Sequence, residues 1–538
     1  MYIILSERKK RESFKTEMEE SMKKKIVCKI MAALLCMVSV FAMTACSGGG
    51  TATEHVTEIN VAWTNLTKTL DPAYDGSTTL FARAGVGESL VKCNIEGKLV
   101  PWLAESIEST DKQNWTITIK DGIKFSNGNV CDAKAVMNSL QYLCDNNKGL
   151  NKSLNIESMS ADGNVLTVKN KSVTVDFESY LSHPQACIQD TSVDDKATGV
   201  IGTGPYKFTA FKAEQSATVE KNENYRGTVN FEKINIFMSN DEAARWLQLQ
   251  SGDVDMVVNA SCSNIETIEN SDDFGYSLST LTTRDRYVIY NLEGKYTSNV
   301  NFRKGLDCLV DKDTIVNSIM LGTAIAGQGC VPAGYDATPE YKGSSYNKEK
   351  ALEYFKAAGL TVSDGKVTDN GQPINLVFHS YSSFSEMNDI VQLIQSAFTS
   401  VGINATVNIT SDDIDDYLGD KSHSSEWDLS MASMFAVPRG DAAYILNTCF
   451  DTASQYNYST TRVANDKLQT MIEQIKVEVN DDTRTQLIKD AALEVEDQCY
   501  MTWYMNPQFN IVYNKKKLSN VPVYASEQYY INDELAGY

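Results

Sequence analysis

Alternating apolar and polar positions mark several short strands along the chain. Residues 57–63 alternate in this way, and so do residues 115–120 and 165–168. A period of two places successive side chains on opposite faces, so each segment is expected to form a half-buried strand. Turn-forming residues follow the first two segments, at 71–76 and at 121–122, and they predict where these strands end.

Other segments have the spacing of amphipathic helices. Residues 131–143 place Ala133, Val136, Leu140 and Leu143 on one helical face. Further helices are predicted at 79–91, 348–358, 388–401 and 464–479. Because short strands and helices alternate to the end of the chain, the pattern predicts α/β lobes rather than a helical bundle or a β-sandwich.

The N-terminal region has the pattern of an export signal. A basic segment with lysines at 23–25 and 29 precedes an apolar run at 30–43. This run is shorter than the roughly 20 apolar residues that span a bilayer, so a signal peptide is expected rather than a membrane helix. Residues 1–21 precede that signal and suggest a start codon chosen too far upstream. We therefore assign residues 1–45 to an upstream extension plus signal peptide.

The apolar run ends at Met43, Thr44, Ala45 and Cys46, which resembles the lipobox of bacterial lipoproteins. Met43 stands where leucine is usual. The resemblance implies a diacylglycerol on the thiol of Cys46. The glycines that follow predict a flexible lipidated tether over residues 46–55.

The charge of the chain restricts its partners. The sequence contains 49 Lys and Arg residues and 70 Asp and Glu residues. Residues 1–45 hold nine of the basic and five of the acidic side chains. The rest of the chain therefore contains 40 basic and 65 acidic residues. Such an acidic protein is not expected to bind nucleic acid or anionic lipid surfaces.

Cysteine and histidine residues are too dispersed for a catalytic or metal centre. Beyond Cys46 there are nine cysteines at wide spacings and without a CxxC pair, so we expect reduced, buried thiols rather than a disulfide framework. The four histidines are His55, His183, His379 and His423, and no HExxH, GxSxG, P-loop or GxGxxG motif occurs. The acidic run at 412–416 favours a helix start over a calcium loop. We therefore expect no enzyme activity, no cofactor and no resident metal.

A series of phrases, in a preserved order from about residue 56 to 530, resembles the peptide/nickel-binding family (family 5) of bacterial ABC-transporter solute-binding proteins. Residues 123–128 read IKFSNG and residues 202–206 read GTGPY. Further phrases of this kind lie at 70–72, 97–106, 115–122, 222–227, 250–255, 302–313 and 346–360. Gly202, Gly204 and Pro205 are expected to make a tight chain reversal, since glycine tolerates positive φ. Gly128 and Gly252 are expected to serve turns in the same way.

The resemblance implies a two-lobed, periplasmic-binding-protein-like α/β fold with a hinge between the lobes and an extra inserted domain. Lobe I would comprise residues 56–90, 200–290 and 508–538, the inserted domain residues 91–199, and lobe II residues 291–507.

The same resemblance implies an extracytoplasmic solute-binding lipoprotein that captures short peptides between its lobes for the permease of an ABC importer. Such a protein would be a monomer, anchored to the outer face of the membrane or lying in the periplasm. Two alternatives stay open. One is a binding protein for nickel or another metal chelate, and the other is a sensor or chaperone of the same fold that takes no part in transport.

The candidate ligand-binding residues also come from the resemblance. Asp441 matches an acid that pairs with a peptide amino terminus, Arg439 could hold a carboxylate, and Phe435 occupies an aromatic position. Arg439 and Asp441 could instead pair only with each other on the surface. His183 falls where the nickel branch carries a chelate-binding arginine. Tyr74 and Asp75 are weaker candidates near the first strand.

The phrases give mixed evidence on the solute. Residues 101–102 and 125–128 are nearer to the nickel branch of the family. Nickel-binding members, however, carry a histidine near positions 451–454, which here read DTAS. The peptide alternative is therefore preferred.

Overall fold

The computed structural model describes residues 55–74, 78–193, 200–343, 345–381, 386–410, 414–420, 423 and 425–538. Cys46, Asp75 and the signal peptide lie outside these ranges. Within them, no helix is long and apolar enough to cross a membrane.

A seven-stranded mixed sheet contains segments from both ends of the described chain, in the order β12-β21-β11-β1-β10-β9-β8. The N-terminal strand β1 pairs in parallel with β10 and β11, and β21 lies antiparallel between β11 and β12. The strands are β1 (Glu58–Trp63), β8 (Tyr206–Lys212), β9 (Ser216–Lys221), β10 (Lys233–Met238), β11 (Met256–Val258), β12 (Phe274–Leu278) and β21 (Asn510–Asn514). Helices α2 (Thr78–Arg83), α6 (Glu242–Ser251) and α7 (Ile265–Glu269) accompany them.

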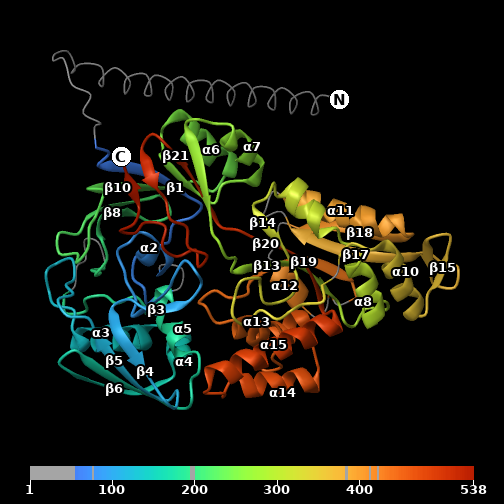
Figure 1. The fold of residues 1–538 in the computed structure, drawn as a ribbon, viewed down its shortest axis with the longest axis horizontal. Coiled ribbons are helices and arrows are strands. Elements are labelled where there is room, and N and C mark those ends of the chain that lie inside the picture. The colour runs from blue at the N-terminus through green and yellow to red at the C-terminus, as the bar shows by residue number, and fades with distance from the viewer. Residues whose placement is uncertain are drawn as a thin grey trace, which may run out of the picture. The chain divides into compact units, whose positions relative to one another are not determined.

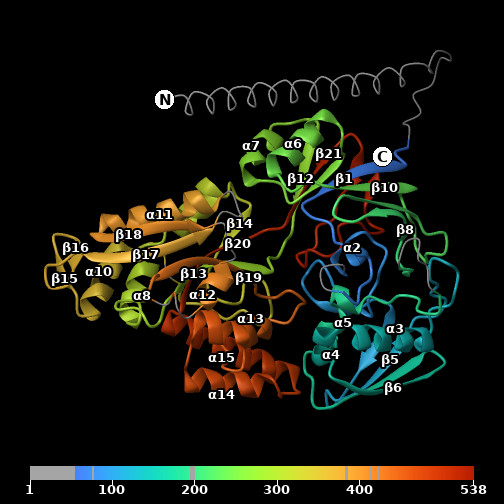
Figure 2. The same cartoon turned by 180° about the vertical axis from the view of Figure 1, so that it is seen from behind.

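A six-stranded sheet has the order β14-β20-β13-β19-β17-β18. In both ribbon views α11 lies on one side of this sheet and α13 and α15 on the other (Figures 1 and 2). The strands are β13 (Arg284–Tyr290), β14 (Ala324–Ala326), β17 (Ile374–Tyr381), β18 (Ile403–Thr410), β19 (Leu429–Phe435) and β20 (Met501–Pro507). The helices of this region are α8 (Val300–Asp307), α9 (Lys312–Thr314), α10 (Lys348–Ala357), α11 (Met387–Ser400), α12 (Ile414–Gly419), α13 (Ala443–Cys449), α14 (Asp466–Ile475) and α15 (Asp481–Gln498). A small hairpin joins β15 (Thr361–Ser363) and β16 (Lys366–Thr368).

A four-stranded antiparallel sheet, β4-β5-β7-β6, is built from one continuous stretch of sequence. Its strands are β4 (Ala104–Glu108), β5 (Asn114–Ile119), β6 (Ile156–Asp162) and β7 (Val165–Asn170), and its helices are α3 (Ala133–Asn146), α4 (Lys148–Leu154) and α5 (Phe177–Leu181). Asp132 caps α3, because its carboxylate accepts the N–H of Ala135 at 2.9 Å. Two further hairpins pair β2 (Val91–Cys93) with β3 (Leu99–Pro101) and β22 (Leu518–Asn520) with β23 (Ala536–Gly537).

Most of the predicted elements are confirmed, but the helix predicted at 79–91 is wrong. Helix α2 ends at Arg83, and β2 begins at Val91. Gly85 has φ +67°, and a Cβ at this position would lie 2.7 Å from the carbonyl oxygen of Ile531. The apolar spacing continues past Arg83, but Gly85 turns the backbone out of the helix, and the carbonyl oxygen of Arg83 accepts the N–H of Ile531 at 2.9 Å.

The reversal at Gly202 and Gly204 has a different cause from the one predicted. Neither glycine has positive φ. Instead, added Cβ atoms would lie 2.0 Å from Val86 O and 2.3 Å from Gly85 O, so both glycines permit a close approach between two backbones. Gly128 and Gly252 do have positive φ, at +91° and +79°, and they serve turns as predicted.

The prediction of reduced, buried cysteines is confirmed. All nine cysteines in the described part of the chain are unpaired, and eight of them are buried. Cys262 is the half-buried exception.

Candidate functional site

A cavity of about 150 Å³ lies where the two large sheets meet. One side comes from the seven-stranded region, with Glu242 at the start of α6 and residues 259–262 after β11. The opposite side comes from the six-stranded region, with residues 320 and 323 and Glu386. Arg284 at the start of β13, Pro507 at the end of β20 and Gln508 just after it complete the lining, where the chain passes between the two sheets.

Arg284 is held at this cavity by two partners. Strands β13 and β19 run antiparallel with Arg284 opposite Phe435, and the guanidinium carbon lies 3.7 Å from the centroid of the Phe435 ring. Glu527 accepts two hydrogen bonds from Arg284, at 2.7 and 3.2 Å. The predicted aromatic residue Phe435 therefore acts on the cavity through Arg284, because it fixes the plane of the guanidinium group.

Arg286 lines the same cavity because it is two residues further along β13, where side chains share a face. It is buried, and its Nη2 lies 3.9 Å from Oε1 of Glu386. The residue between the arginines, Asp285, contacts Trp503 and Asn506 instead. Strand alternation thus brings two guanidinium groups together without bringing the intervening carboxylate into the cavity.

The charges of the cavity suit a solute that carries both signs. Two arginines face three carboxylates, those of Glu242, Glu386 and Glu527. A guanidinium group can hold a carboxylate through two parallel hydrogen bonds, and a carboxylate can accept hydrogen bonds from an ammonium group. In a partly desolvated setting these groups would fix the orientation of a zwitterion.

A second group of the predicted residues lies between α5 and the loop after β19. The carbonyl oxygen of Arg439 accepts a hydrogen bond from Ser179 Oγ at 3.2 Å. The buried guanidinium of Arg439 lies over the rings of Tyr180 and Tyr444, at 4.9 and 5.0 Å from their centroids. Arg439 therefore connects the region of the four-stranded sheet with that of the six-stranded sheet.

The charge of Arg439 affects the pKa of His183. Burial and, secondarily, the Arg439 guanidinium lower the pKa of His183 to about 3, so its imidazole is neutral at physiological pH. Nδ1 accepts the N–H of Gln185 at 3.0 Å and caps a short 3₁₀ helix. This contact assigns the proton of the neutral imidazole to Nε2.

Asp441 is paired with Arg484 rather than with Arg439. Arg484 donates to both carboxylate oxygens of Asp441, at 3.1 to 3.2 Å. Burial would raise the pKa of Asp441, but Arg484 outweighs that effect and the pKa is lowered. The alternative of an exposed Arg439–Asp441 pair is therefore wrong, since both side chains are largely buried.

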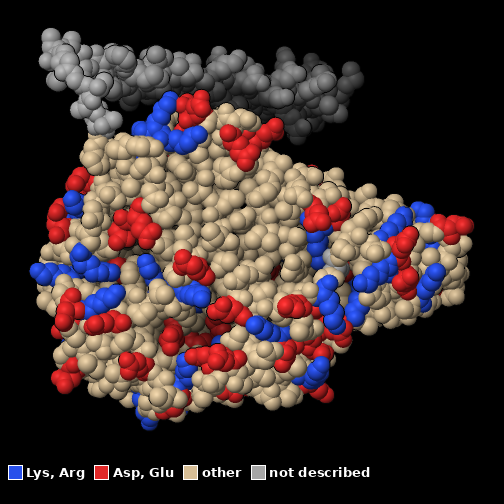
Figure 3. All heavy atoms as spheres, in the orientation of Figure 1, with Lys and Arg blue, Asp and Glu red and all other residues tan. Residues whose placement is uncertain are grey.

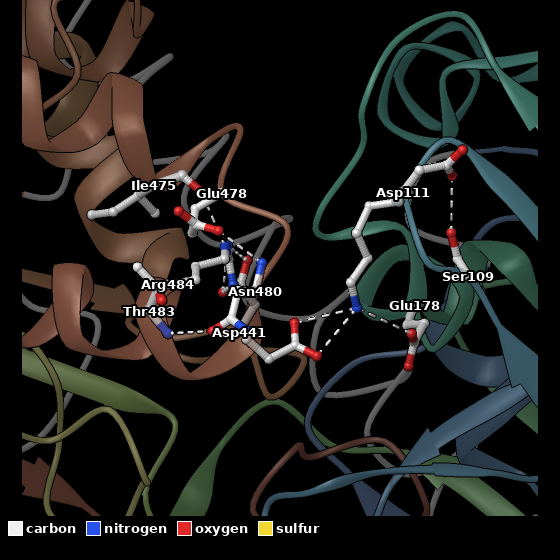
Figure 4. Close-up of polar contacts among 11 residues, drawn as sticks. Ser109, Asp111, Glu178, Asp441, Ile475, Glu478, Asn480, Thr483 and Arg484 are labelled. Atoms are coloured by element: carbon white, nitrogen blue, oxygen red, sulfur yellow. Dashed lines mark hydrogen bonds and ion pairs between the residues drawn. The ribbon is translucent and has the colours of Figure 1, made fainter.

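Lys112 also connects the region of the four-stranded sheet with that of the six-stranded sheet. Its Nζ lies 3.2 Å from Oδ1 of Asp481 at the start of α15, and 3.9 Å from Oε1 of Glu178 on α5. Figure 4 shows Glu178 on one side of this junction and Asp441 with Arg484 on the other. On the face in Figure 3, acidic and basic side chains are interspersed rather than segregated.

The predicted residues thus divide between two places. Phe435 lies beside the arginine cavity, whereas His183, Arg439 and Asp441 gather at α5. Tyr74 is 54% exposed.

Sequence reasoning missed the charged residues of the cavity, namely Glu242, Arg284, Arg286, Glu386 and Glu527. The alternation Arg-Asp-Arg at the start of a strand was an available signal for the two arginines. No local pattern indicated Glu527, which is separated from Arg284 by more than 240 positions.

The described residues include no group of three or more His, Cys, Asp or Glu side chains that could hold a metal ion.

Comparison with known proteins identifies related sequences. The family model "Bacterial extracellular solute-binding proteins, family 5 Middle" matches residues 98–457. The nickel-binding protein NikA of Staphylococcus aureus is 28% identical over 411 residues, covering 76% of this chain and 80% of that protein. The oligopeptide-binding protein OppA of Bacillus subtilis is 23% identical over 447 residues, covering 75% and 79%.

Solved structures give a similar result. The nickel ABC transporter protein of Bacillus halodurans matches with a TM-score of 0.79 and 29% identity, covering 89% of this chain and 99% of that one. The DppA protein of Helicobacter pylori, in complex with the peptide STSA, matches with a TM-score of 0.67 over 90% and 99% of the two chains. Its identity of 17% supports the fold alone.

Proposed function

Because the chain belongs to the bacterial extracellular solute-binding proteins of family 5, we propose that it captures a short peptide in the arginine cavity and delivers it to the permease of an ABC importer. The fold is the two-lobed, periplasmic-binding-protein-like α/β fold of that family. The observation that carries the choice of solute is the pair Arg284 and Arg286 facing Glu242, Glu386 and Glu527. A peptide has one carboxylate and one ammonium terminus, so it complements both charges.

We assign the seven-stranded sheet to lobe I, the four-stranded sheet to the inserted domain at 91–199, and the six-stranded sheet to lobe II. Strand β13 pairs with β19 and β20 of the six-stranded sheet. The boundary between the lobes is therefore placed near residues 279–284 rather than at 290. The two connecting segments that line the cavity then serve as the hinge.

The size of the cavity makes closure part of the proposal. A volume of about 150 Å³ is below the roughly 300–1,000 Å³ of common ligand pockets. A peptide of several residues would therefore need the lobes to lie further apart than they do in this structure.

Calorimetry with a panel of di- and tripeptides tests this proposal directly. Arg286→Met should weaken the best peptide by at least tenfold, because loss of one partner of a buried charge pair costs about 2–5 kcal/mol. Lys134→Gln changes an exposed lysine on α3 and should bind like the wild type. The proposal fails if no peptide binds, or if Arg286→Met binds as tightly as the wild type. The peptide should also be recovered unchanged, since we propose no enzyme activity.

A metal chelate is the second candidate solute. The relatives from Staphylococcus aureus and Bacillus halodurans carry nickel in their names. Arg284 and Arg286 would hold the carboxylates of the chelator, and the chelator would hold the metal. Nickel alone, a nickel–histidine chelate and the best peptide should be compared in one titration series. If the chelate binds more tightly than every peptide, the solute is a metal chelate rather than a peptide.

We further propose that Cys46 carries a lipid and that the protein is a monomer on the outer face of the membrane. Cys46→Ala should release the protein into the medium or periplasm, and light scattering should give the mass of one chain. Retention of the variant at the membrane at wild-type levels would contradict the anchor.

A further inference from the structure

A second cavity, of about 240 Å³, lies within lobe II, apart from the arginine cavity. Four lysines line it: Lys304 on α8, Lys312 on α9, Lys342 in a loop and Lys350 on α10. We call it the lysine pocket. Two buried side chains of β20, Met501 and Trp503, contribute apolar surface to it.

The lysines exceed the carboxylates available to neutralise them. Lys312 is 8% exposed, and its Nζ lies 3.7 Å from Oδ1 of Asp307. Lys304 lies 3.5 Å from Asp497, whose side chain is 62% exposed. Among the described residues, no carboxylate lies within ion-pair distance of Lys342 or Lys350. Both of these ion pairs are longer than a strong charge-assisted hydrogen bond of about 2.7–2.9 Å.

A third carboxylate of the pocket is already engaged. Glu496 accepts the backbone N–H of Gly343 at 2.8 Å. One of its oxygens is therefore committed to the loop that carries Lys342, and four lysines still face three carboxylates in this pocket.

The helix ends that meet at this pocket do not account for the lysines. Helices α8 and α15 both end here, and helix C-termini attract cations. However, Arg303 donates to the carbonyl oxygens of Gln498 and Cys499 at 2.7 and 2.8 Å. The carbonyl of Cys308 accepts the N–H of Asn347 at 2.9 Å. These three carbonyls are therefore satisfied without a lysine.

We propose that the lysine pocket is a second binding site, for a small organic anion with an apolar body. Lys312 and Lys304 would hold its carboxylate or phosphate group, with Lys342 and Lys350 at the rim. The apolar body would pack on Met501 and Trp503, where it is removed from water. Burial of Lys312 strengthens this contact, because charges interact more strongly where water is partly excluded. This site is independent of the peptide proposal, since no residue lines both cavities.

Calorimetry with benzoate, phenyl phosphate, inorganic phosphate and the neutral benzamide tests the assignment. We expect saturable binding of benzoate or phenyl phosphate at about 1 mM or tighter, and at least tenfold weaker binding of benzamide. The stronger of the two anions identifies the preferred head group. Binding of inorganic phosphate as tight as that of phenyl phosphate would overturn the requirement for an apolar body.

Variants locate the site. Lys312→Met keeps the length of a largely buried chain and should weaken the anion at least tenfold, and Lys350→Gln should weaken it less. Lys134→Gln and Arg286→Met should leave anion binding unchanged, so failure of the peptide proposal does not affect this result. The proposal is overturned if neither benzoate nor phenyl phosphate binds, or if folded Lys312→Met, checked by circular dichroism, binds like the wild type.

Discussion

The indole Nε1 of Trp503 on β20 donates a hydrogen bond to Oδ2 of Asp285 on the neighbouring strand β13, at 2.9 Å. In the sequence Asp285 lies between the two arginines that line the arginine cavity, whereas Trp503 lines the lysine pocket. Burial raises the pKa of Asp285 well above its usual value, although the hydrogen bonds from Trp503 and Asn506 oppose the shift.

Trp503→Phe should lower the free energy of unfolding by about 1–3 kcal/mol, because it removes a donor from a buried carboxylate. Urea unfolding measures this change. In a double-mutant cycle with Asp285→Ala, the two losses should not add. If the double variant lost the sum of the two single losses, the hydrogen bond between Trp503 and Asp285 would contribute nothing to stability.

Asp176 should make stability depend on pH. Burial and the charge of Asp441 raise its pKa to about 6. A carboxyl whose folded-state pKa is raised holds its proton longer in the folded state, so stability falls as pH rises from about 4 to 6. Wild type should lose about 2–3 kcal/mol more than Asp176→Asn across this window. Parallel pH profiles for the two proteins would contradict the prediction.

Asp441→Asn should lower the free energy of unfolding by about 3–5 kcal/mol, since Arg484 would remain buried without its carboxylate. The lowered pKa of Asp441 has the opposite pH consequence from Asp176. Its contribution is present above pH 4 and is lost as pH falls through the lowered pKa. Asp162→Asn, at an exposed position in β6, is the matched control and should change stability by no more than about 0.5 kcal/mol. Equal effects of the two variants would contradict a buried pair.

Cys262 should react before the other eight cysteines of the described part of the chain. It is half-buried and lines the arginine cavity, whereas the others are buried. Burial raises the pKa of its thiol to about 11, so alkylation by iodoacetamide at pH 8 should be slow but selective. A bound peptide should slow it further, as peptide mass spectrometry would show. The Arg286→Met variant should show no such protection, and unchanged labelling with saturating peptide would place the solute elsewhere.

Local patterns predicted those elements whose causes are local. The alternation at 57–63 and 165–168 matches β1 and β7. A strand with one buried face places apolar residues at every second position, so the pattern is visible in the strand's own sequence. The helix predicted at 79–91 ends at Arg83: Gly85, which follows with positive φ, was a local stop signal that was not used, and the partner of the Arg83 carbonyl, Ile531, lies far away in the sequence. Gly202 and Gly204 were recognised as special, but the backbone that they approach could not be known.

The candidate site followed the same rule. Arg439, Asp441 and His183 were found because they lie in family phrases, and the structure brings them to one junction. The partner of Asp441 was missed, since Arg484 lies 43 positions away on another helix. The arginine cavity is assembled from segments around 242, 284, 386 and 527, so its charge pattern exists only in the folded chain.

The position of β21 in its sheet has a consequence for secretion. This strand, at residues 510–514, lies between β11 and β12, and β12 has no other partner in the sheet. A chain that crosses the membrane N-terminus first would therefore present an unpaired β12 until almost all of it has emerged. The inserted sheet at 104–170 is continuous in sequence and can close much earlier. The seven-stranded sheet thus takes strands from both ends of the described chain and closes late, so we expect it to depend most on chaperones during export.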